Sequence, residues 1–348
     1  MRLPKPTRVA VIGCGYWGPN LVRVLAASAL GEVRTLCDVR ESAMLPLAQQ
    51  YAKDASLKTH YKDVLADADI DAIVVATPAA THFDICRDGL RAGKHVLVEK
   101  PLATRATECR ELIDLAERQG LTLMVGHVFL YNAAVLKAKE YIDGGELGDV
   151  IYAWSQRLNL GRIQTDLNCL WSFAPHDVSI LCYWLGQTPA RVSTFGFSYL
   201  HKGVEDVVFA SLSFPSGVGG HLHLSWLDPR KVRTMTLVGD KKMLVYDDVS
   251  TESRLQLYDK GVIPGVFRDP ARSLGEFQLQ TRGGDLLIPT FRFLEPLSVE
   301  VDHFLDCIRT GQRPRTDGRN GLQVVQVLEA MDKSLRLGGA PVEVDRGE

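Results

Sequence analysis

The sequence predicts an α/β protein in two parts: an N-terminal doubly wound parallel sheet and a C-terminal α/β domain built on an open, mainly antiparallel sheet. In the N-terminal part, short apolar runs alternate with longer amphipathic ones, which is typical of parallel strands joined by helices. These runs do not alternate with polar residues, as expected for strands that helices cover on both faces. After Gly126 the runs follow closely, several with period two and interrupted by Gly and Pro, which favours an antiparallel sheet. The length of 348 residues suits two domains, placed at residues 1–125 and 126–348.

The individual elements follow from the same patterns. The expected parallel strands are RVAVIG, EVRTLCD, DAIVVAT, HVLVEK and LTLMVG. The expected strands of the second sheet are VIYAWSQRLNL, ARVSTFGFSYL, VVFASLSF, GGHLHLSWL, RTMTLVG and MLVYDD. One helix, PHDVSILCYWLG, interrupts that sheet, with Pro175 in its first turn and Gly186 at its C-terminal cap. Two helices, over 299–310 and 321–337, close the chain.

Composition excludes several classes of partner. The formal net charge is -2, and no lysine- and arginine-rich run offers a surface for nucleic acid or anionic lipid. The apolar runs are strand-sized, and the N-terminus lacks the pattern of a secretory signal, so we expect a cytoplasmic protein. The seven cysteines are scattered and never spaced as C-x-x-C, which predicts reduced thiols and no metal site. A small molecule is the expected partner.

A glycine-rich motif follows the first expected strand. Gly13, Gly15 and Gly18 form G-x-G-x-x-G at the start of the first helix. In a Rossmann dinucleotide-binding domain the first glycine permits a tight turn, the second lets the backbone approach a pyrophosphate, and the third permits helix packing on the strand. Backbone N–H groups at the helix start, such as those of Tyr16 and Trp17, would bind the phosphates. A glycine-rich turn without a ligand is the less favoured alternative.

The second expected strand ends in an acid that indicates which dinucleotide binds. Asp38 lies 23 residues after Gly15, near the spacing of a carboxylate that binds the ribose hydroxyls and repels a 2′-phosphate. NAD is therefore the expected cofactor. Arg40, two residues later, could instead pair with that phosphate, so NADP stays open.

The next two expected strands end in polar residues. Thr77, Pro78 and His82 follow one strand, and Glu99 and Lys100 end the other. Ligands of open parallel sheets bind at the carboxyl ends of the strands, so all five are expected to line the cofactor site. By position alone, Lys100 is either a solvent-facing charge or the group that meets substrate at the reactive end of the cofactor.

These motifs, together with TPAATHFDICRDGLRAGKHVLVEKPLA and HDVSILCYWLG, resemble the glucose-fructose oxidoreductase, inositol dehydrogenase and rhizopine-catabolism family over essentially the whole chain. The resemblance implies an NAD(P)-dependent oxidoreductase with Lys100 as catalytic lysine and His176 as catalytic histidine. SWLDPRKVRTMTLVGDKKMLVYDD and EPLSVEVDHFLDCIRTGQRP are further similar to dehydrogenases that oxidise C3 of UDP-N-acetylhexosamines or their uronic acids. Such relatives imply a role in surface-polysaccharide or amino-sugar biosynthesis.

The implied roles agree with the chemistry of alcohol oxidation. His176 suits the base that removes the hydroxyl proton, and the first turn of a helix would keep it neutral. Lys100, as a cation, suits stabilisation of the developing alkoxide. Many members of the family carry an aspartate where this chain has Ser172, so the charge that orients His176 must come from elsewhere. Asp166 and Asp177 are the candidates.

The segment RLNLGRIQTDLN precedes the expected catalytic helix. Its arginine-bearing character suits the phosphates of a UDP-sugar better than a neutral inositol. The expected substrate-binding residues are Lys100, Arg157, Asn159, Asp166, Asn168, Ser172 and His176. Two alternatives stay open: a dehydrogenase for free sugars or inositols, and a non-catalytic NAD-binding sugar sensor. The uncovered face of the second sheet predicts a homodimer or homotetramer.

Overall fold

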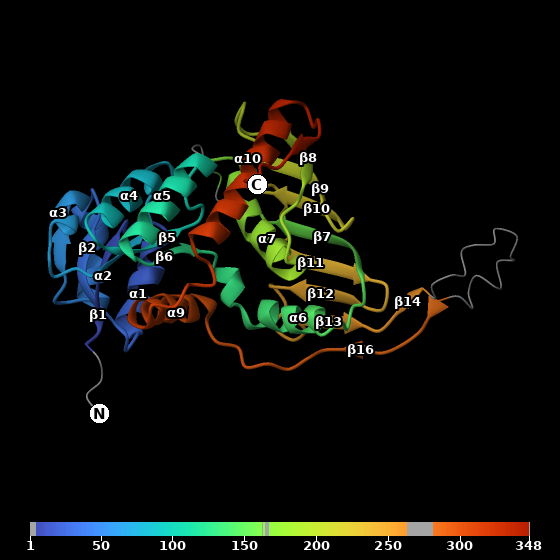
Figure 1. Ribbon diagram of the computed structural model, residues 1–348, viewed down its shortest axis with the longest axis horizontal. Coiled ribbons are helices and arrows are strands. Elements are labelled where there is room, and N and C mark those ends of the chain that lie inside the picture. The colour runs from blue at the N-terminus through green and yellow to red at the C-terminus, as the bar shows by residue number, and fades with distance from the viewer. Residues whose placement is uncertain (1–4, 162, 164–166, 263–280, 348) are drawn as a thin grey trace, which may run out of the picture. The chain divides into compact units, whose positions relative to one another are not determined.

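The computed structural model describes residues 5–161, 163, 167–262 and 281–347 (Figure 1). The chain divides into two compact units: unit 1 comprises residues 1–132 and 294–326, and unit 2 comprises residues 133–293 and 327–348. The predicted boundary at 125/126 lies seven residues before the division at 132/133, and the expected pair of continuous domains did not include the return of residues 294–326 to unit 1. This return has a physical cause, because Leu297, Val301 and Phe304 pack into the core of unit 1.

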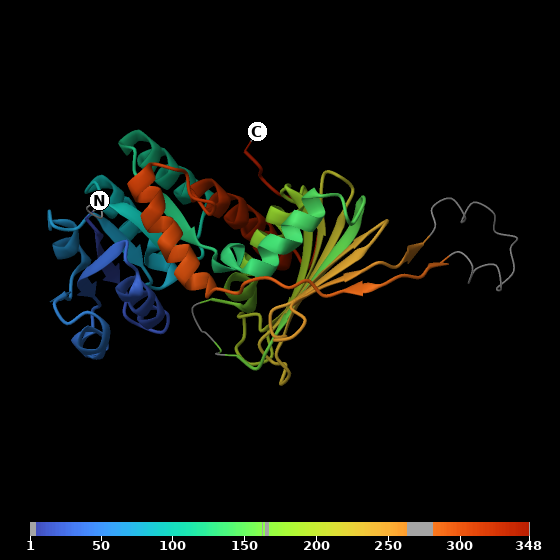
Figure 2. The ribbon, with the colours of Figure 1, turned by 90° about the horizontal axis from the view of Figure 1, so that it is seen from below.

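Unit 1 is built on a six-stranded parallel sheet, as predicted (Figures 1 and 2). The strand order is β3-β2-β1-β4-β5-β6. The strands are β1 (Thr7–Ile12), β2 (Gly31–Cys37), β3 (Ser56–Lys58), β4 (Ala72–Val75), β5 (His95–Glu99) and β6 (Leu123–Gly126). Sequence analysis identified all of these except β3, whose three residues are too few to show a period. The order changes direction between β1 and β4, and in such sheets ligands bind outside the carboxyl ends at this switch point.

Helices connect these strands and cover the sheet. They are α1 (Gly18–Ala27), α2 (Glu41–Tyr51), α3 (Tyr61–Leu65), α4 (His82–Arg91), α5 (Ala106–Gln119) and α9 (Pro296–Thr310), with 3-10 turns η1 (Ala79–Thr81) and η2 (Val128–Tyr131). α9 packs against α1 and η2. α10 (Gly318–Arg336) begins in unit 1 and ends in unit 2. The two closing helices therefore occupy nearly the predicted positions.

Unit 2 is built on a nine-stranded sheet of order β16-β13-β12-β11-β7-β10-β9-β8-β17. Its strands are β7 (Val150–Leu158), β8 (Arg191–Phe197), β9 (Val207–Ser213), β10 (Gly219–Ser225), β11 (Val232–Gly239), β12 (Met243–Asp247), β13 (Leu255–Tyr258), β16 (Leu286–Leu287) and β17 (Val342–Glu343). A separate ribbon pairs β14 (Gly261–Val262) with β15 (Thr281–Arg282). β7 and β10 run parallel, and the other pairs are antiparallel, so the predicted mainly antiparallel sheet is confirmed.

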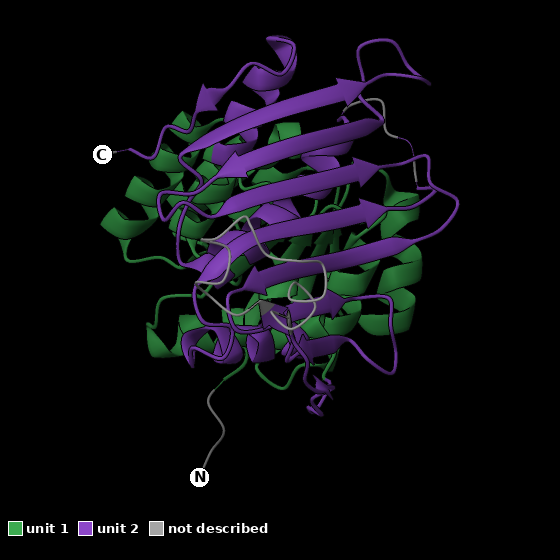
Figure 3. Cartoon of the chain, turned by 90° about the vertical axis from the view of Figure 1, so that its right-hand side faces the viewer, with its two compact units in different colours: residues 1–132, 294–326 green, residues 133–293, 327–348 purple. Residues whose placement is uncertain are grey.

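One face of this sheet packs against helices of unit 2. α7 (Cys169–Leu185) lies against β7, β9 and β10, and α6 (Ala133–Asp143) lies against β12. Figure 3 looks onto the opposite face of the sheet. Among the described residues, none of the helices combines the length and apolar character needed to cross a membrane.

The predicted start of α7 was wrong. The helix begins at Cys169, and the Asn168 side chain caps it by accepting a hydrogen bond from the Trp171 backbone N–H at 3.1 Å. Pro175 therefore lies inside the helix and not in its first turn. The apolar residues before Pro175 extend the buried face of the helix, which outweighs the one backbone hydrogen bond that proline removes.

Candidate active site

The glycine-rich loop of unit 1 has the geometry of a phosphate cradle. Gly13 has φ of +99°, and a Cβ there would lie 2.5 Å from the Ala76 carbonyl oxygen. A Cβ on Gly18 would lie 2.2 Å from the Gly13 carbonyl oxygen. Gly15 differs, because the nearest atom to its Cβ position is a guanidinium nitrogen of Arg40 at 4.0 Å. Two glycines thus permit close packing, while Gly15 leaves its backbone open to approach, and the loop fits a dinucleotide.

Asp38 and Arg40 both lie beside this loop. Asp38 accepts hydrogen bonds from the backbone N–H groups of Cys14, at 2.8 Å, and Arg40, at 2.9 Å. These bonds fix the carboxylate at the end of β2, where a ribose-binding acid is expected. The Arg40 guanidinium is 3.6 Å from Asp38 and two-thirds exposed. Tyr16 is 77% exposed and Trp17 is partly buried at the start of α1.

His82 has a different role from the one predicted. It is fully buried, and its two ring nitrogens lie 2.7 Å from the Pro101 carbonyl oxygen and 2.9 Å from the Thr77 carbonyl oxygen. A neutral imidazole can donate to only one of these acceptors. His82 therefore ties the loop after β4 to the loop after β5 and supports the edge of the sheet where the cofactor is predicted to bind. Thr77 and Pro78 remain at the edge of the sheet, where Thr77 accepts a hydrogen bond from Thr81.

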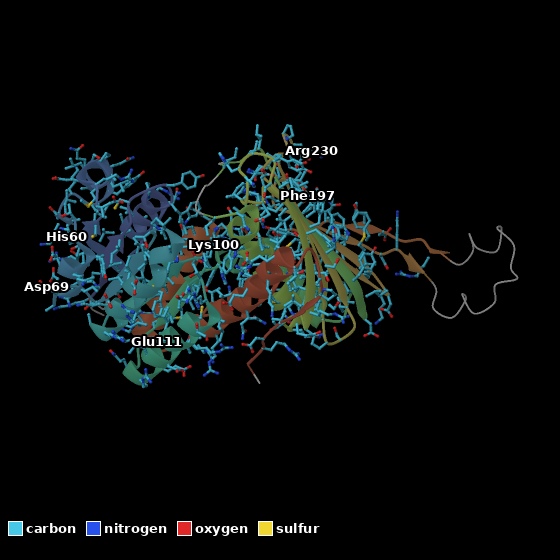
Figure 4. All side chains as sticks on the ribbon, turned by 90° about the horizontal axis from the view of Figure 1, so that it is seen from above. His60, Asp69, Lys100, Glu111, Phe197 and Arg230 are labelled. Carbon is cyan, nitrogen blue, oxygen red and sulfur yellow. The ribbon has the colours of Figure 1, made fainter. Side chains whose placement is uncertain are left out.

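Glu99 and Lys100 end β5 at the same edge (Lys100 is labelled in Figure 4). Lys100 joins Pro101 through a cis peptide bond. The Glu99 carboxyl lies beside Gly126, 3.2 Å from the position that a Cβ there would occupy. It accepts a hydrogen bond from the Lys100 backbone N–H at 3.3 Å. Glu99 is partly exposed as a residue, but the loss of water around its carboxyl raises its pKa to about 7, although the charge and backbone N–H of Lys100 act in the opposite direction. The Trp17 indole N–H also lowers this pKa, without reaching hydrogen-bond geometry.

Two further titratable residues of unit 1 were missed by sequence analysis. His127 follows β6, is fully buried, and hydrogen-bonds to the Asn320 side-chain oxygen through Nδ1 at 2.7 Å. Burial lowers the pKa of His127 to about 4, and the charge of Lys100 adds to that effect. Glu300 on α9 is also fully buried, and burial and the charge of Glu99 raise its pKa well above the usual range.

His176 lies two turns into α7 and is partly exposed, whereas Pro175 and Asp177 beside it are buried. The dipole at the helix N-terminus therefore acts on His176 less than it would at the predicted first-turn position, since that effect fades within the first turn. Ser172 lies one turn earlier and is 7% exposed. The backbone carbonyl of His176 accepts a hydrogen bond from Ser179 at 2.8 Å.

The guanidinium of Arg157, a predicted substrate-binding residue, is buried in an ion pair. The side chain is 4% exposed and donates to both carboxylate oxygens of Asp177, at 2.8 Å and 3.0 Å. Burial alone would lower the pKa of Arg157, but the charge and hydrogen bonds of Asp177 outweigh burial and raise it. This pair engages the Arg157 guanidinium and both carboxylate oxygens of Asp177.

The remaining predicted substrate residues separate into three cases. Asn168 caps α7 and donates a hydrogen bond to Glu205 at 2.7 Å, so its side chain has a structural role. Asn159 follows β7, is partly exposed, and keeps its side chain available as a candidate. Asp166 lies outside the described residues. Within the ranges the structure describes, no group of three or more His, Cys, Asp or Glu is arranged to hold a metal ion.

The carboxyl edge of the unit 1 sheet combines a glycine-rich loop, an acid after β2 and a lysine after β5. This combination is typical of NAD(P)-dependent oxidoreductases. Two family models match the chain. Residues 7–127 match the oxidoreductase family with an NAD-binding Rossmann fold, and residues 135–245 match the GFO/IDH/MocA C-terminal domain. The chain therefore belongs to the GFO/IDH/MocA oxidoreductase family, as the resemblance predicted.

Individual relatives span nearly the whole chain. The scyllo-inositol 2-dehydrogenase (NAD(+)) of Bacillus subtilis is 27% identical over 354 residues, which cover 97% of this chain and 96% of that protein. GenD2 from gentamicin A biosynthesis, in complex with NAD, aligns with a TM-score of 0.82 at 25% identity, covering 99% of this chain and 97% of that one. The WlbA dehydrogenase from Bordetella pertussis, in complex with NADH and UDP-GlcNAcA, aligns with a TM-score of 0.77 at 22% identity, covering 97% and 99%.

Proposed function

We propose that the protein oxidises a ring hydroxyl, at C3, of a nucleotide-linked sugar, with Lys100 and His176 as its catalytic residues. The observation that carries the proposal is the position of Lys100, which ends β5 at the same sheet edge as the glycine cradle and Asp38. Ligands of such sheets bind at this edge, next to the switch in strand order. Lys100 is thereby suited to meet the substrate at the reactive end of the cofactor.

Each side chain has one task in this reaction. The chemistry that a bound NAD supplies is acceptance of a hydride from the alcohol carbon. His176 takes the hydroxyl proton as general base, because an imidazole titrates near the working pH. Lys100 stays cationic and stabilises the developing alkoxide oxygen. Asp38 binds the ribose hydroxyls of the cofactor and favours NAD over NADP.

Two substrate classes have separate support. The segments at 225–248 and 295–314 are similar to UDP-N-acetylhexosamine dehydrogenases, and the WlbA structure of the same fold contains UDP-GlcNAcA. These observations support a nucleotide-linked sugar made for surface polysaccharides or amino sugars. The second candidate is a free polyol such as an inositol. It is supported by the full-length relative that acts on scyllo-inositol and by the burial of Arg157, which was the predicted phosphate ligand.

Calorimetry separates the two classes. The purified protein with saturating NAD is titrated with UDP, UDP-N-acetylglucosamine, its uronic acid and scyllo-inositol, and formation of reduced nicotinamide is followed by absorbance. We expect UDP to bind alone and a UDP-sugar to bind more tightly and reduce NAD. Reduction by scyllo-inositol without any binding of UDP would establish the second candidate. Binding of a sugar that never reduces NAD would instead indicate a sensor.

The uncovered face of the unit 2 sheet supports a homo-oligomer. Phe195 and Phe197 on β8 are 53% and 46% exposed (Phe197 is labelled in Figure 4), and Phe197 stacks on Tyr199 with ring centroids 6.0 Å apart. The aromatic rings continue across the neighbouring strands at Phe209 and His223. A face of this character is typical of a subunit interface. Light scattering should show a dimer or tetramer, and a monomer would remove this part of the proposal.

A further inference from the structure

Unit 1 buries a second carboxyl group behind Glu99. Glu300 lies on α9 with no exposed surface, and within the described residues neither of its carboxyl oxygens has a hydrogen-bond partner. α9 packs against η2, which directly follows Gly126 and His127, and the Glu99 carboxyl lies 3.2 Å from the position that a Cβ on Gly126 would occupy. The charge of Glu99 adds to the effect of burial in raising the pKa of Glu300. Native proteins rarely leave a buried carboxyl in such surroundings without a purpose.

The surroundings of Glu300 favour its neutral form. Within the described part of the chain, the charge of Glu99 on β5 raises the pKa of Glu300, and the charge of Glu300 raises the pKa of Tyr131 on η2. Arg315 stacks over the Tyr131 ring, 5.0 Å from its centroid, and donates to the Leu130 carbonyl oxygen. On α1, the neighbouring helix, Arg23 pairs with Glu295 at the start of α9. A buried carboxylate without a paired cation or hydrogen bonds is strongly disfavoured, so Glu300 keeps its proton.

The surroundings of Glu99 favour the opposite outcome. Glu99 has the charge of Lys100 beside it and accepts the Lys100 backbone N–H. Glu300 is fully buried, whereas Glu99 is partly exposed. Of two neighbouring carboxyls, the one with access to water, the cation and the donor ionises first. The single negative charge of the pair therefore belongs on Glu99.

A second set of polar atoms lies close to the pair. The Trp17 indole nitrogen, near Glu99, and His127 Nε2, on the residue after Gly126, are both buried and have no hydrogen-bond partner among the described residues. Because His127 Nδ1 donates to the Asn320 side-chain oxygen, its Nε2 is left as an acceptor. One buried water with two to four polar partners could join such groups.

We propose that Glu300 stays a neutral acid and donates its carboxyl proton toward Glu99, directly or through one buried water, and so holds the negative charge of the pair beside Lys100. Glu300 is thus a positioning residue that acts through Glu99. The inference rests on the proposed role of Lys100 in catalysis. The donor stabilises the Glu99 carboxylate, which in turn keeps Lys100 cationic for its task at the alkoxide.

Infrared difference spectroscopy tests the charge state without any turnover. At pH 8, the wild-type minus Glu300→Gln spectrum should contain one carboxylic-acid C=O band, because exposed carboxyls are ionised there. The matched control is Glu295→Gln at the start of the same helix, which should give no such band. In a Glu99→Leu background the Glu300 band should move to the higher frequency of a weaker hydrogen bond. The proposal would be overturned if the band were absent, or if its frequency stayed the same in the Glu99→Leu background.

The pH titration of Glu99 tests the donation from Glu300. The Glu99 carboxylic-acid band, obtained as wild type minus Glu99→Gln, should grow as the pH falls through about 7. Glu300→Leu should raise that midpoint by about 1, a tenfold change in the ionisation ratio, while Glu300→Gln, which keeps a donor, should leave it in place. If both variants match the wild type, Glu300 does not act on Glu99. A Lys100→Met protein that keeps wild-type turnover would refute the proposed function while leaving the Glu300 band intact, so the two failures are distinguishable.

Discussion

The Arg157 guanidinium and the Asp177 carboxylate form a paired ion bridge, at 2.8 Å and 3.0 Å, with both side chains almost completely buried. Arg157 lies on β7 and Asp177 on α7, immediately after His176. The bridge therefore fixes the helix that carries the proposed base against its sheet. Paired Arg–carboxylate contacts have a defined geometry, so the bridge also sets the rotation of this helix turn.

Removal of Arg157 should act mainly on stability. Arg157→Ala leaves the Asp177 charge buried and unpaired, so the free energy of unfolding should fall by about 3–5 kcal/mol in urea denaturation. The control is Arg34→Ala, which removes an exposed pair with Glu32 and should cost less than about 1 kcal/mol. If Arg157→Ala is as stable as the control and loses affinity only for a UDP-sugar, the sequence-based assignment of Arg157 as a phosphate ligand is restored.

Two glycines of the cradle should respond differently to a methyl group. Gly15→Ala has room for its Cβ, so stability should change by less than about 0.5 kcal/mol, while the affinity for NAD should fall at least about tenfold. Gly18→Ala places its Cβ 2.2 Å from the Gly13 carbonyl oxygen and should cost about 1–3 kcal/mol of stability. Thermal unfolding and calorimetry with NAD measure the two effects. Unchanged NAD affinity in Gly15→Ala would show that the pyrophosphate of NAD does not bind at this loop.

The Asp38 carboxylate should determine the choice of dinucleotide. Asp38→Asn keeps the size of the side chain but removes the charge, and the ratio of NAD to NADP affinity should fall about tenfold to a hundredfold. Arg40→Ala serves as the matched control at the same edge and should weaken only NADP. A wild-type protein that binds NADP as tightly as NAD would transfer the role to Arg40.

His127 should make the protein sensitive to acid. Its pKa in the folded protein is about 4, below the ordinary value of 6.5, so the unfolded chain takes up the proton first as the pH falls. The stabilising contribution is complete above pH 6.5 and is lost as the pH falls toward 4, by about 3 kcal/mol in total. His127→Gln should lack this loss in urea titrations across that range. The control is His60→Gln, at an exposed position, which should keep this loss of stability. If His127→Gln lost as much stability in acid as the wild type, protonation of His127 would not be the cause.

The strands of both sheets were predictable because burial imposes a period on them. Uninterrupted apolar runs identified β1, β4 and β5, and alternation identified the strands from β7 to β12. The glycine motif was predictable as well, since a positive φ at Gly13 leaves few other residue types. The strands β3 and β13 and the two-residue strands after Tyr258 were not predicted, because they contain too few residues to show a clear period.

The side-chain partners in the site could not be predicted in the same way. An arginine in a strand gives no sign of whether it meets a phosphate or a carboxylate 20 residues later, and Arg157 does the latter. Pro175 suggested a helix start because proline is common there, but Asn168, seven residues earlier, caps the helix. Glu300 did leave a signal, since it interrupts the apolar stripe of Leu297, Val301 and Phe304 on α9.

Catalysis should depend on both Lys100 and His176. His176→Asn keeps approximate size and removes the base, which should lower the rate of hydride transfer about 10²- to 10⁴-fold while NAD binding survives. Lys100→Met keeps the apolar stem and removes the charge that stabilises the alkoxide, with a loss of about 10²-fold or more. The measurement is a single-turnover burst as well as the steady-state rate, because a burst reports hydride transfer even where product release limits turnover. A wild-type burst that both variants reproduce at the same rate would show that neither side chain takes part in the chemistry, and the charged end of β5 would need another explanation.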